Sequence, residues 1–445
     1  MVDNAATAGG GKPPTGCPFD LRQMDEVVPT LRSPDIEHHP EQFAGVATDP
    51  VNGEINIREF LDGAMIYLHG GEHRARRKML NQLVRADSLS FIREDLILPE
   101  VDRLLGARLA QPDADGLYAL DLVDLCERVF LRFTAKLIGL VNVDREGAID
   151  ALRSCAGPLA AGTSSAFLED RAQINKIALE AKQRYVEEFY LPARDAYREM
   201  MAEVARGERD DADVPASLMK FIVTNADPAY ADEGRAIVES TMLFAASVGT
   251  STQSVVQTVD LLQGWFRDHP EDLAVKTDPG FLLDALAETI RLRAPFSPYV
   301  CRVAAKDHPI GERIIEEGQE IHVHYVYANR SPEVFGDDAG SFNPRRPSPA
   351  NGLPRYGVGF GVGIHQCYGM RVVLGNEGKG GSHVHMLRTL MAAGVKPDGR
   401  TPPTDLKKDL SKFSIEDIPR YTAYPAVFTE WDPANPPSAL QPVEA

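Results

Sequence analysis

Apolar positions recur every three to four residues along most of the middle of the chain, which is the spacing of amphipathic helices. The pattern predicts helices over residues 74–84, 98–109, 120–140, 174–205, 234–266 and 281–292. Strand signals are fewer and come late. In residues 310–324, Ile314 and Ile315 precede a Glu-Glu-Gly-Gln turn and an alternation of Ile321, Val323 and Tyr325, which predicts a hairpin. Helices followed by clustered strands indicate a mainly α fold with small β-sheets, of the α+β class.

The two ends of the chain differ in composition from the rest. Residues 1–18 are rich in Gly and Pro and are expected to form a disordered leader, and residues 433–445 a Pro-rich tail. No low-complexity linker divides residues 19–432. We expect neither a signal peptide nor a membrane-spanning helix, because no basic segment precedes an apolar run and no window approaches 18 uncharged apolar residues.

The net charge of −18 excludes some partners. Binding of nucleic acid or of an anionic membrane surface needs clustered Lys and Arg, so neither is expected. The five cysteines are widely spaced and form no C-x-x-C, which argues against a disulfide framework and a structural zinc site. This pattern favours the reducing cytoplasm.

The segment from Tyr356 to Gly369 carries the strongest chemical signal. Five glycines, at 357, 359, 361, 363 and 369, surround Cys367. Glycine allows a backbone to approach a flat ligand closely, and backbone N–H groups can point at a sulfur anion. No frame fits the dinucleotide fingerprint or a Walker loop. Spacing alone leaves open a surface loop with an inert cysteine.

The residues Phe360-Gly361-x-Gly363-x-His365-x-Cys367-x-Gly369 match the haem-binding signature of the cytochrome P450 family at every fixed position. The resemblance implies one triangular-prism domain over residues 19–432, with haem b bound through the Cys367 thiolate. By the same resemblance, His73 and Arg77 of an H-x-x-x-R pattern, Arg302 and His365 would contact the haem propionates. Without the resemblance, His73 and Arg77 would be interpreted as part of an ordinary basic helix face, and Arg302 as a solvated residue at the end of a strand.

A second family pattern, E-x-x-R, is matched by Glu288 and Arg291. The family joins this pair to an Arg in a later loop, which resembles Arg346 in Phe342-Asn-Pro-Arg-Arg346. The resemblance therefore implies a structural role for Glu288, Arg291 and Arg346. Taken alone, the pair at i and i+3 would be an ordinary helix ion pair.

The central helix departs from the family, which usually reads A/G-G-x-D/E-T there. The best motif register places Gly249 at the Gly, Ser251 at the acid and Thr252 at the Thr. Counting from Glu288 or Pro270 favours Gln253 and Ser254 instead. We predict Thr252 and Ser251 as catalytic, although the hydroxyls could simply bond back to the helix. Neither register supplies a carboxylate, so protons must come through hydroxyls, water or substrate.

The segment after the cysteine also departs from the family. A helix with Glu nine residues after Cys is usual, but here Glu377 is ten residues after it, inside Gly375-Asn-Glu-Gly-Lys-Gly-Gly381. Four glycines weaken a helix, so this one is expected to be irregular.

By the resemblance, the chain is a monooxygenase acting on a small apolar or aromatic molecule. The expected pocket residues are Met65, Ala245, Ala246, Gly249, Phe296 and Ser297. No flavin or nicotinamide fingerprint occurs, so electrons are expected from a ferredoxin and its reductase. A basic patch of Arg74, Arg76, Arg77 and Lys78 could dock that partner. Two alternatives remain: a peroxide-driven or oxygen-independent enzyme, and a non-catalytic haem sensor or carrier.

Overall fold

The computed structural model describes residues 19–38, 63–163, 171–293, 299–349, 352–376, 379–405 and 418–439. The expected leader, residues 1–18, lies outside these ranges. The α-helices are α1 (Met24–Arg32), α4 (Gly70–Leu80), α5 (Ala86–Phe91), α6 (Leu98–Arg108), α7 (Leu122–Ile138), α8 (Ala148–Thr163), α9 (Arg171–Tyr185), α10 (Leu191–Arg206), α11 (Leu218–Val223), α12 (Glu233–Asp268), α13 (Pro279–Arg293), α14 (Tyr325–Ala328), α15 (Pro332–Phe335), α16 (Met370–Leu374) and α17 (Ser382–Ala392). Shorter helical turns include η1 (Met65–Tyr67), η5 (Val186–Tyr190) and η9 (Gly363–His365).

The strands are short and belong to five sheets in the described part of the chain. They are β1 (Phe19–Leu21), β2 (Ile36–His38), β3 (Ala119–Asp121), β4 (Val300–Ala304), β5 (His308–Ile310), β6 (Arg313–Ile315), β7 (Glu320–Val323), β8 (Gly375–Asn376), β9 (Lys379–Gly380), β10 (Val395–Pro397), β11 (Thr404–Asp405), β12 (Tyr421–Ala423) and β13 (Pro425–Phe428). The largest sheet has the order β1-β7-β4-β2, with β1 parallel to β7 and the other pairs antiparallel.

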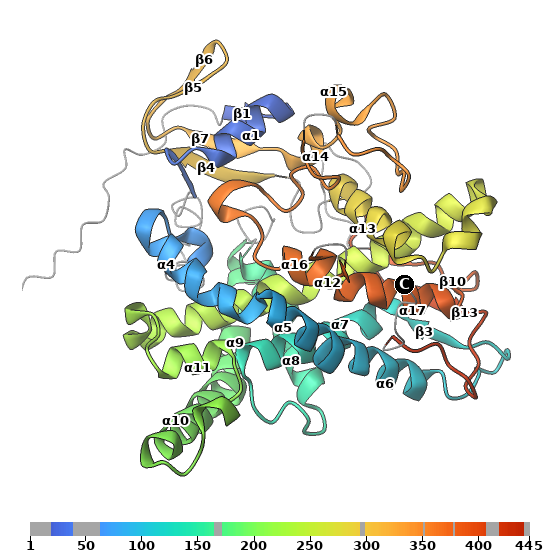
Figure 1. Cartoon of the computed structure of the whole chain (residues 1–445), viewed down its shortest axis with the longest axis horizontal. Coiled ribbons are helices and arrows are strands. Elements are labelled where there is room, and N and C mark those ends of the chain that lie inside the picture. The colour runs from blue at the N-terminus through green and yellow to red at the C-terminus, as the bar shows by residue number, and fades with distance from the viewer. Residues whose placement is uncertain are drawn as a thin grey trace, which may run out of the picture.

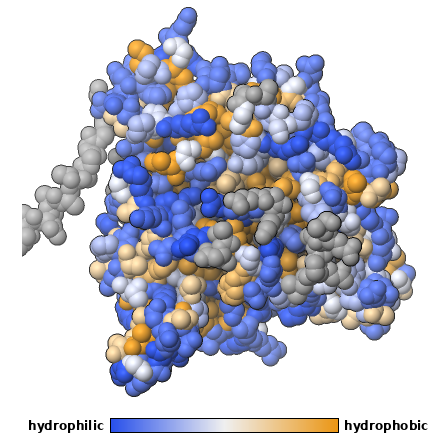
Figure 2. Space-filling model, in the orientation of Figure 1, coloured by the Kyte–Doolittle hydropathy of each residue, from blue (hydrophilic) through white to orange (hydrophobic). Residues whose placement is uncertain are grey.

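Figure 1 shows this sheet with α1 at one end of the molecule and the helices from α5 to α12 filling the other. The main hydrophobic core lies among the helices, and a smaller core joins α1 to the sheet. The face seen in Figure 2 is largely hydrophilic, with hydrophobic residues gathered between the two parts. No helix in the described ranges is long and apolar enough to cross a membrane.

Helix α12 organises the core. It has 36 residues and spans about 54 Å at about 1.5 Å per residue. Asp232 caps its start, since the carboxylate accepts a hydrogen bond from Gly234 N at 2.9 Å. The helix packs against α7, α8 and α13. This packing explains why apolar periodicity predicted the helix almost to its ends.

Two predicted elements differ from the structure. The helix expected over residues 174–205 consists of α9 and α10, joined by the π-helical turn η5. The hairpin expected over residues 310–324 has the wrong pairing: β6 pairs with β5, and β7 pairs with β4 and β1. Gly311, at φ +57°, makes the tight β5–β6 turn possible. Tyr325 begins α14 instead of continuing the strand.

The chain stays packed beyond residue 432. Trp431 Nε1 donates a hydrogen bond to the Leu109 carbonyl at 2.9 Å, and Ala439 N donates one to Asp102 at 2.7 Å. Ala439 is buried. The first part of the expected tail therefore lies against α6.

The glycine-rich segment after Cys367 breaks the helix, as expected. Helix α16 ends at Leu374, and Gly375, at φ +91°, leads into the β8–β9 hairpin before α17 begins. A Cβ on Gly381 would lie 2.2 Å from the Val373 carbonyl oxygen, so only glycine allows this approach. Glu377 lies outside the described residues.

Candidate functional site

The loop that carries Cys367 is held tightly against the core. A Cβ on Gly359 would lie 2.8 Å from the Ile290 carbonyl oxygen in α13. The Asn329 side chain accepts a hydrogen bond from Val358 N at 2.8 Å and donates one to the Arg291 carbonyl at 3.1 Å. Cys367 N donates to the Phe360 carbonyl at 2.7 Å. These contacts fix the position of the cysteine backbone.

The Cys367 side chain is exposed to solvent, unlike Cys126, Cys155 and Cys301. It still lies among enough protein atoms for burial to raise the pKa of its thiol. Backbone N–H groups of Gly369 and Met370 and the Arg77 guanidinium act in the opposite direction. An accessible sulfur with these donors is suited to bind a metal as a thiolate.

Basic side chains from several elements converge near this loop. The His365 ring lies 4.4 Å from the rings of both His38 and His73 and 5.3 Å from that of His69. Burial, followed by His73 and Arg302, lowers the pKa of His365 to about 3. Burial also lowers the pKa of His73 to about 4, with Arg77 and His69 contributing.

This basic cluster, which comprises His38, His69, His73, Arg302 and His365, contains unsatisfied ring nitrogens. In the described part of the chain, His38 Nε2, His73 Nδ1 and both ring nitrogens of His365 have no hydrogen-bond partner. Buried polar groups without partners are costly, and an anionic ligand would satisfy them. Sequence reasoning predicted His73, Arg302 and His365 but missed His38 and His69, for which no motif exists.

Neighbouring arginines of α4 have different surroundings. Arg77 donates to Asn81 Oδ1 at 3.2 Å and lies over the Tyr368 ring, near Cys367. Arg76 is fully buried and paired with Asp227 and, at 2.7 Å, with Glu239 of α12. Arg76 therefore cannot belong to a docking patch, which corrects that expectation.

Most side chains near the middle of α12 are buried, but one stripe of residues there is exposed. Ala246 and Gly249 are exposed and Thr250 is half-buried, with its hydroxyl donating to the Ala246 carbonyl at 2.6 Å. Ser251 and Thr252 are buried, and the Thr252 hydroxyl has no hydrogen-bond partner among the described residues. Thr250 is therefore more accessible than Thr252, which the motif register selects, and the half-buried Ser247 hydroxyl is paired with Thr134.

The residues of the alternative register, Gln253 and Ser254, make hydrogen bonds within the structure. Gln253 donates to the Tyr421 carbonyl at 2.8 Å, and Ser254 donates to the Thr250 carbonyl at 2.6 Å. Beginning the family motif at Ala246 gives Ala-Ser-Val-Gly-Thr, which ends at Thr250. That alignment puts Ser247 at the Gly and Gly249 at the acid, so the sequence alone did not favour it.

The expected pocket residues are only partly accessible. Met65 and Ala245 are buried, and Met65 N donates to Glu239 at 3.2 Å. Phe296 and Ser297 lie outside the described residues. Ala246 and Gly249 are exposed, and a Cβ on Gly249 would meet nothing within 4 Å.

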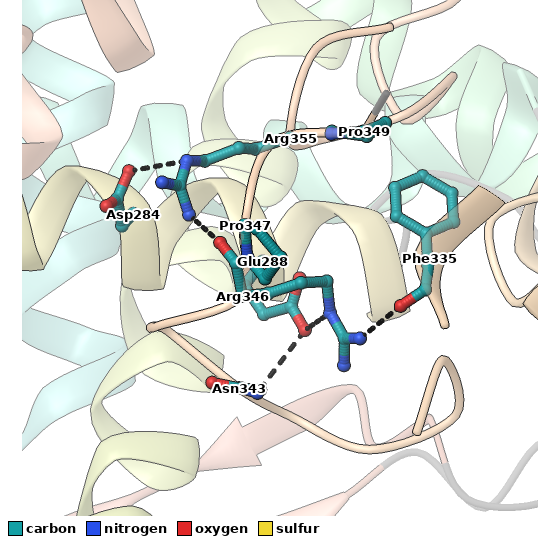
Figure 3. A pocket seen from close by; sticks show the side chains of 8 residues that line it. All are labelled: Asp284, Glu288, Phe335, Asn343, Arg346, Pro347, Pro349 and Arg355. Carbon is teal, nitrogen blue, oxygen red and sulfur yellow. Dashed lines mark hydrogen bonds and ion pairs between the residues drawn. The ribbon is translucent and has the colours of Figure 1, made fainter. Parts of the chain in front are cut away.

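Glu288, Arg291 and Arg346 form one buried cluster. Figure 3 shows Glu288 and Arg346 of this cluster together with Asn343. Arg291 donates two hydrogen bonds of 2.7 Å to the Glu288 carboxylate, and Arg346 donates a third at 3.0 Å. Asn343 N adds another at 3.1 Å. The cluster joins α13 to the loop that precedes Cys367.

The chain is similar in sequence to known haem proteins. The cytochrome P450 family model matches residues 280–373, which include α13 and the cysteine loop. Cytochrome P450 165A3 of Amycolatopsis orientalis is 25% identical over 230 residues, 50% of this chain and 54% of that protein. Cytochrome P450-SU2 of Streptomyces griseolus is 29% identical over 182 residues, 40% of each. The matches thus span about half or less of these relatives' length.

Solved structures match over a longer range. HmtT, involved in himastatin biosynthesis, superposes with a TM-score of 0.66 at 19% identity, covering 94% of this chain and 96% of that one. A mutant of EryK in complex with erythromycin B gives 0.64 at 21% identity, covering 92% and 90%. The fold is that of the cytochromes P450. Together with the matched family model and sequence relatives, it shows that this chain belongs to the cytochrome P450 family.

Proposed function

We propose that this chain is a haem-thiolate monooxygenase that oxidises a small, largely apolar or aromatic organic molecule. The observation that carries the proposal is the accessible Cys367 sulfur, fixed in a glycine loop beside unpaired basic side chains. Relatives are mostly bacterial, and several structural neighbours act in the biosynthesis that their names describe. We infer a similar role in the bacterial cytoplasm.

The residues present fit the haem that the family implies. Cys367 would bind the iron of haem b, and His73, Arg302 and His365 would bind its two propionates, whose carboxylates would satisfy the unpaired nitrogens. His38 and His69 are placed to assist. Arg77, near the Cys367 sulfur, would assist in holding the thiolate charge and one propionate. Thiolate-bound haem supplies the activation of dioxygen.

We further propose that Thr250 of α12 takes part in proton delivery. Its hydroxyl donates to the Ala246 carbonyl, so its oxygen lone pairs remain able to accept a hydrogen bond from water. No Asp or Glu occurs from Ala246 to Ser254. Proton delivery would therefore depend on Thr250, water and groups on the substrate.

Electrons would come from a separate ferredoxin and its reductase. Arg74 and Lys78 are exposed on α4 and remain available for an acidic partner, whereas Arg76 is not. The exposed small residues Ala246 and Gly249 would leave room for the substrate.

The first experiment is an absorption spectrum of the dithionite-reduced protein with and without carbon monoxide. We expect a strongly red-shifted Soret band, lost in Cys367→Ser and kept in Cys155→Ala, which removes a cysteine of α8. A Soret band at the position typical of histidine ligation in the unsubstituted protein would refute thiolate binding.

The second experiment compares Thr250→Ala with Thr252→Ala. Product formed per oxygen consumed should drop in Thr250→Ala and stay near normal in Thr252→Ala. The reverse result would restore the motif register. Full turnover with hydrogen peroxide alone would favour the peroxide-driven alternative, which the missing carboxylate also supports.

A further inference from the structure

The four-stranded sheet has two chemically different faces. In register, Asp20 of β1 pairs with His322 of β7, and His322 pairs with Cys301 of β4. Residues paired in register project from the same face of a sheet, and residues two apart on one strand share it. One face therefore carries Asp20, Cys301, Glu320 and His322. The other carries Arg302, paired with His38, which belong to the basic cluster.

Histidine and carboxylate side chains on the first face lie close together. His324 Nε2 is 2.9 Å from Asp20 Oδ1, and His322 Nδ1 is 3.5 Å from the same oxygen. One ligand atom from each of the three residues lies within 4.8 Å of the others. Tyr299 packs against both imidazoles, with ring centroids 4.8 and 5.1 Å away.

Glu320 orients the His322 ring. Its carboxylate is 2.8 Å from His322 Nε2 and favours the neutral tautomer whose Nε2–H donates a hydrogen bond to it, and in that tautomer the Nδ1 lone pair faces Asp20. A carboxylate behind a histidine in this way is typical of metal ligands, because it fixes the tautomer and raises the basicity of the ligating nitrogen. The contact between Nδ1 and Asp20, two acceptors, is then explained by a cation between them.

The spacing suits zinc. Ligands at about 2.0–2.2 Å in a tetrahedron are separated by about 3.3–3.6 Å. The separations of Asp20 Oδ1 from His324 Nε2 and His322 Nδ1, 2.9 and 3.5 Å, lie close to that value.

We propose that Asp20, His322 and His324 bind one zinc ion, with Glu320 as the positioning residue for His322. The Asp20 side chain is 46% exposed and that of His324 only 9%, so the ion would enter from solvent and rest against a buried ligand. Water would fill the fourth position. A rival set, Cys301, Glu320 and His322, shares His322 and cannot be occupied simultaneously. Zinc binding by this rival set would require the loss of the Glu320–His322 hydrogen bond.

The test uses the full-length haem protein after treatment with a chelator. Zinc is added, unbound metal is removed by gel filtration, and the zinc-to-protein ratio is measured by elemental analysis. A competing chromophoric chelator then gives the affinity. We expect one zinc per chain, a loss of binding in Asp20→Asn and His322→Gln, and an affinity about 10–100-fold weaker in Glu320→Gln.

His269→Gln is the matched control, since His269 Nδ1 also faces a carboxylate, that of Glu271, at 3.5 Å on the surface. It should leave binding unchanged. Unchanged Soret and far-ultraviolet spectra establish that each variant folds. The proposal is overturned if the unsubstituted protein retains no zinc, or if Asp20→Asn binds it normally. Zinc retained in Asp20→Asn but lost in Cys301→Ser would assign the ion to the rival set and equally overturn this one.

Discussion

Replacing Glu288 by Gln should destabilise the protein far more than its single lost charge suggests. The Glu288 carboxylate accepts four hydrogen bonds, from Arg291, Arg346 and Asn343. Both guanidiniums are buried, with side chains 0% and 5% exposed. Removing one partner of a buried ion pair costs about 3–5 kcal/mol, because the remaining charge is uncompensated. The unfolded population should therefore rise by roughly 100- to 1,000-fold or more, at about tenfold per 1.4 kcal/mol.

Urea unfolding at pH 7, followed by far-ultraviolet circular dichroism, measures this change. The control is Glu430→Gln, because Glu430 pairs with Lys276 at 2.5 Å but its side chain is 52% exposed. Exposed pairs contribute about 0–1 kcal/mol. If the two variants shift the free energy of unfolding by similar amounts, the reasoning from burial is wrong.

Two further predictions concern the helix after the cysteine loop. Burial lowers the pKa of His383, which is stacked on Phe130, to about 3. Neutral His383 therefore contributes stability above pH 6.5 that is lost as the pH falls toward 3, and the loss is roughly 3 kcal/mol at pH 4. In His383→Leu, the free energy of unfolding should fall less between pH 7 and pH 4; equal falls would contradict this. Gly381→Ala should lower the melting temperature, since the new Cβ meets the Val373 carbonyl and overpacking costs about 1–3 kcal/mol. Gly264→Ala, with open space in α12, should instead gain about 0.4–1 kcal/mol, and a loss as large as that of Gly381→Ala would refute the steric argument.

The long helices could be predicted from the sequence because their signals are local. The apolar period alone placed helix α12 within two residues of its ends. Strand pairing could not be predicted, because β7 joins β1 across about 300 residues and nothing near either strand specifies the partner. The alternation of apolar and polar residues in β7 could be recognised in the sequence, but the strands that pair with β7 could not.

The candidate site shows the same division. The spacing around Cys367 was readable, since the glycines serve a local backbone purpose. The sequence did not reveal which of the two threonine hydroxyls is accessible. Thr250 and Thr252 lie on different sides of α12, and their exposure depends on which side of the helix faces the core. Likewise, His73 and Arg77 matched a motif, whereas the burial of Arg76 depends on Asp227, a residue 151 positions away.

The interruption between α16 and α17 separates the segment that lies beside Cys367 from the segment that packs in the core, whereas one continuous helix would join them. The donors nearest the Cys367 sulfur belong to Gly369 and Met370, at the start of α16. Helix α17 is buried among α6, α12 and α13 and reaches α16 through close contacts such as Ser382 Oγ to the Val372 carbonyl at 2.8 Å. The backbone donors to the sulfur therefore lie within one turn of Cys367, and Arg77 adds its charge from α4, so neither contribution comes from beyond Leu374. A change of sequence beyond Leu374 would therefore leave these two backbone donors in place.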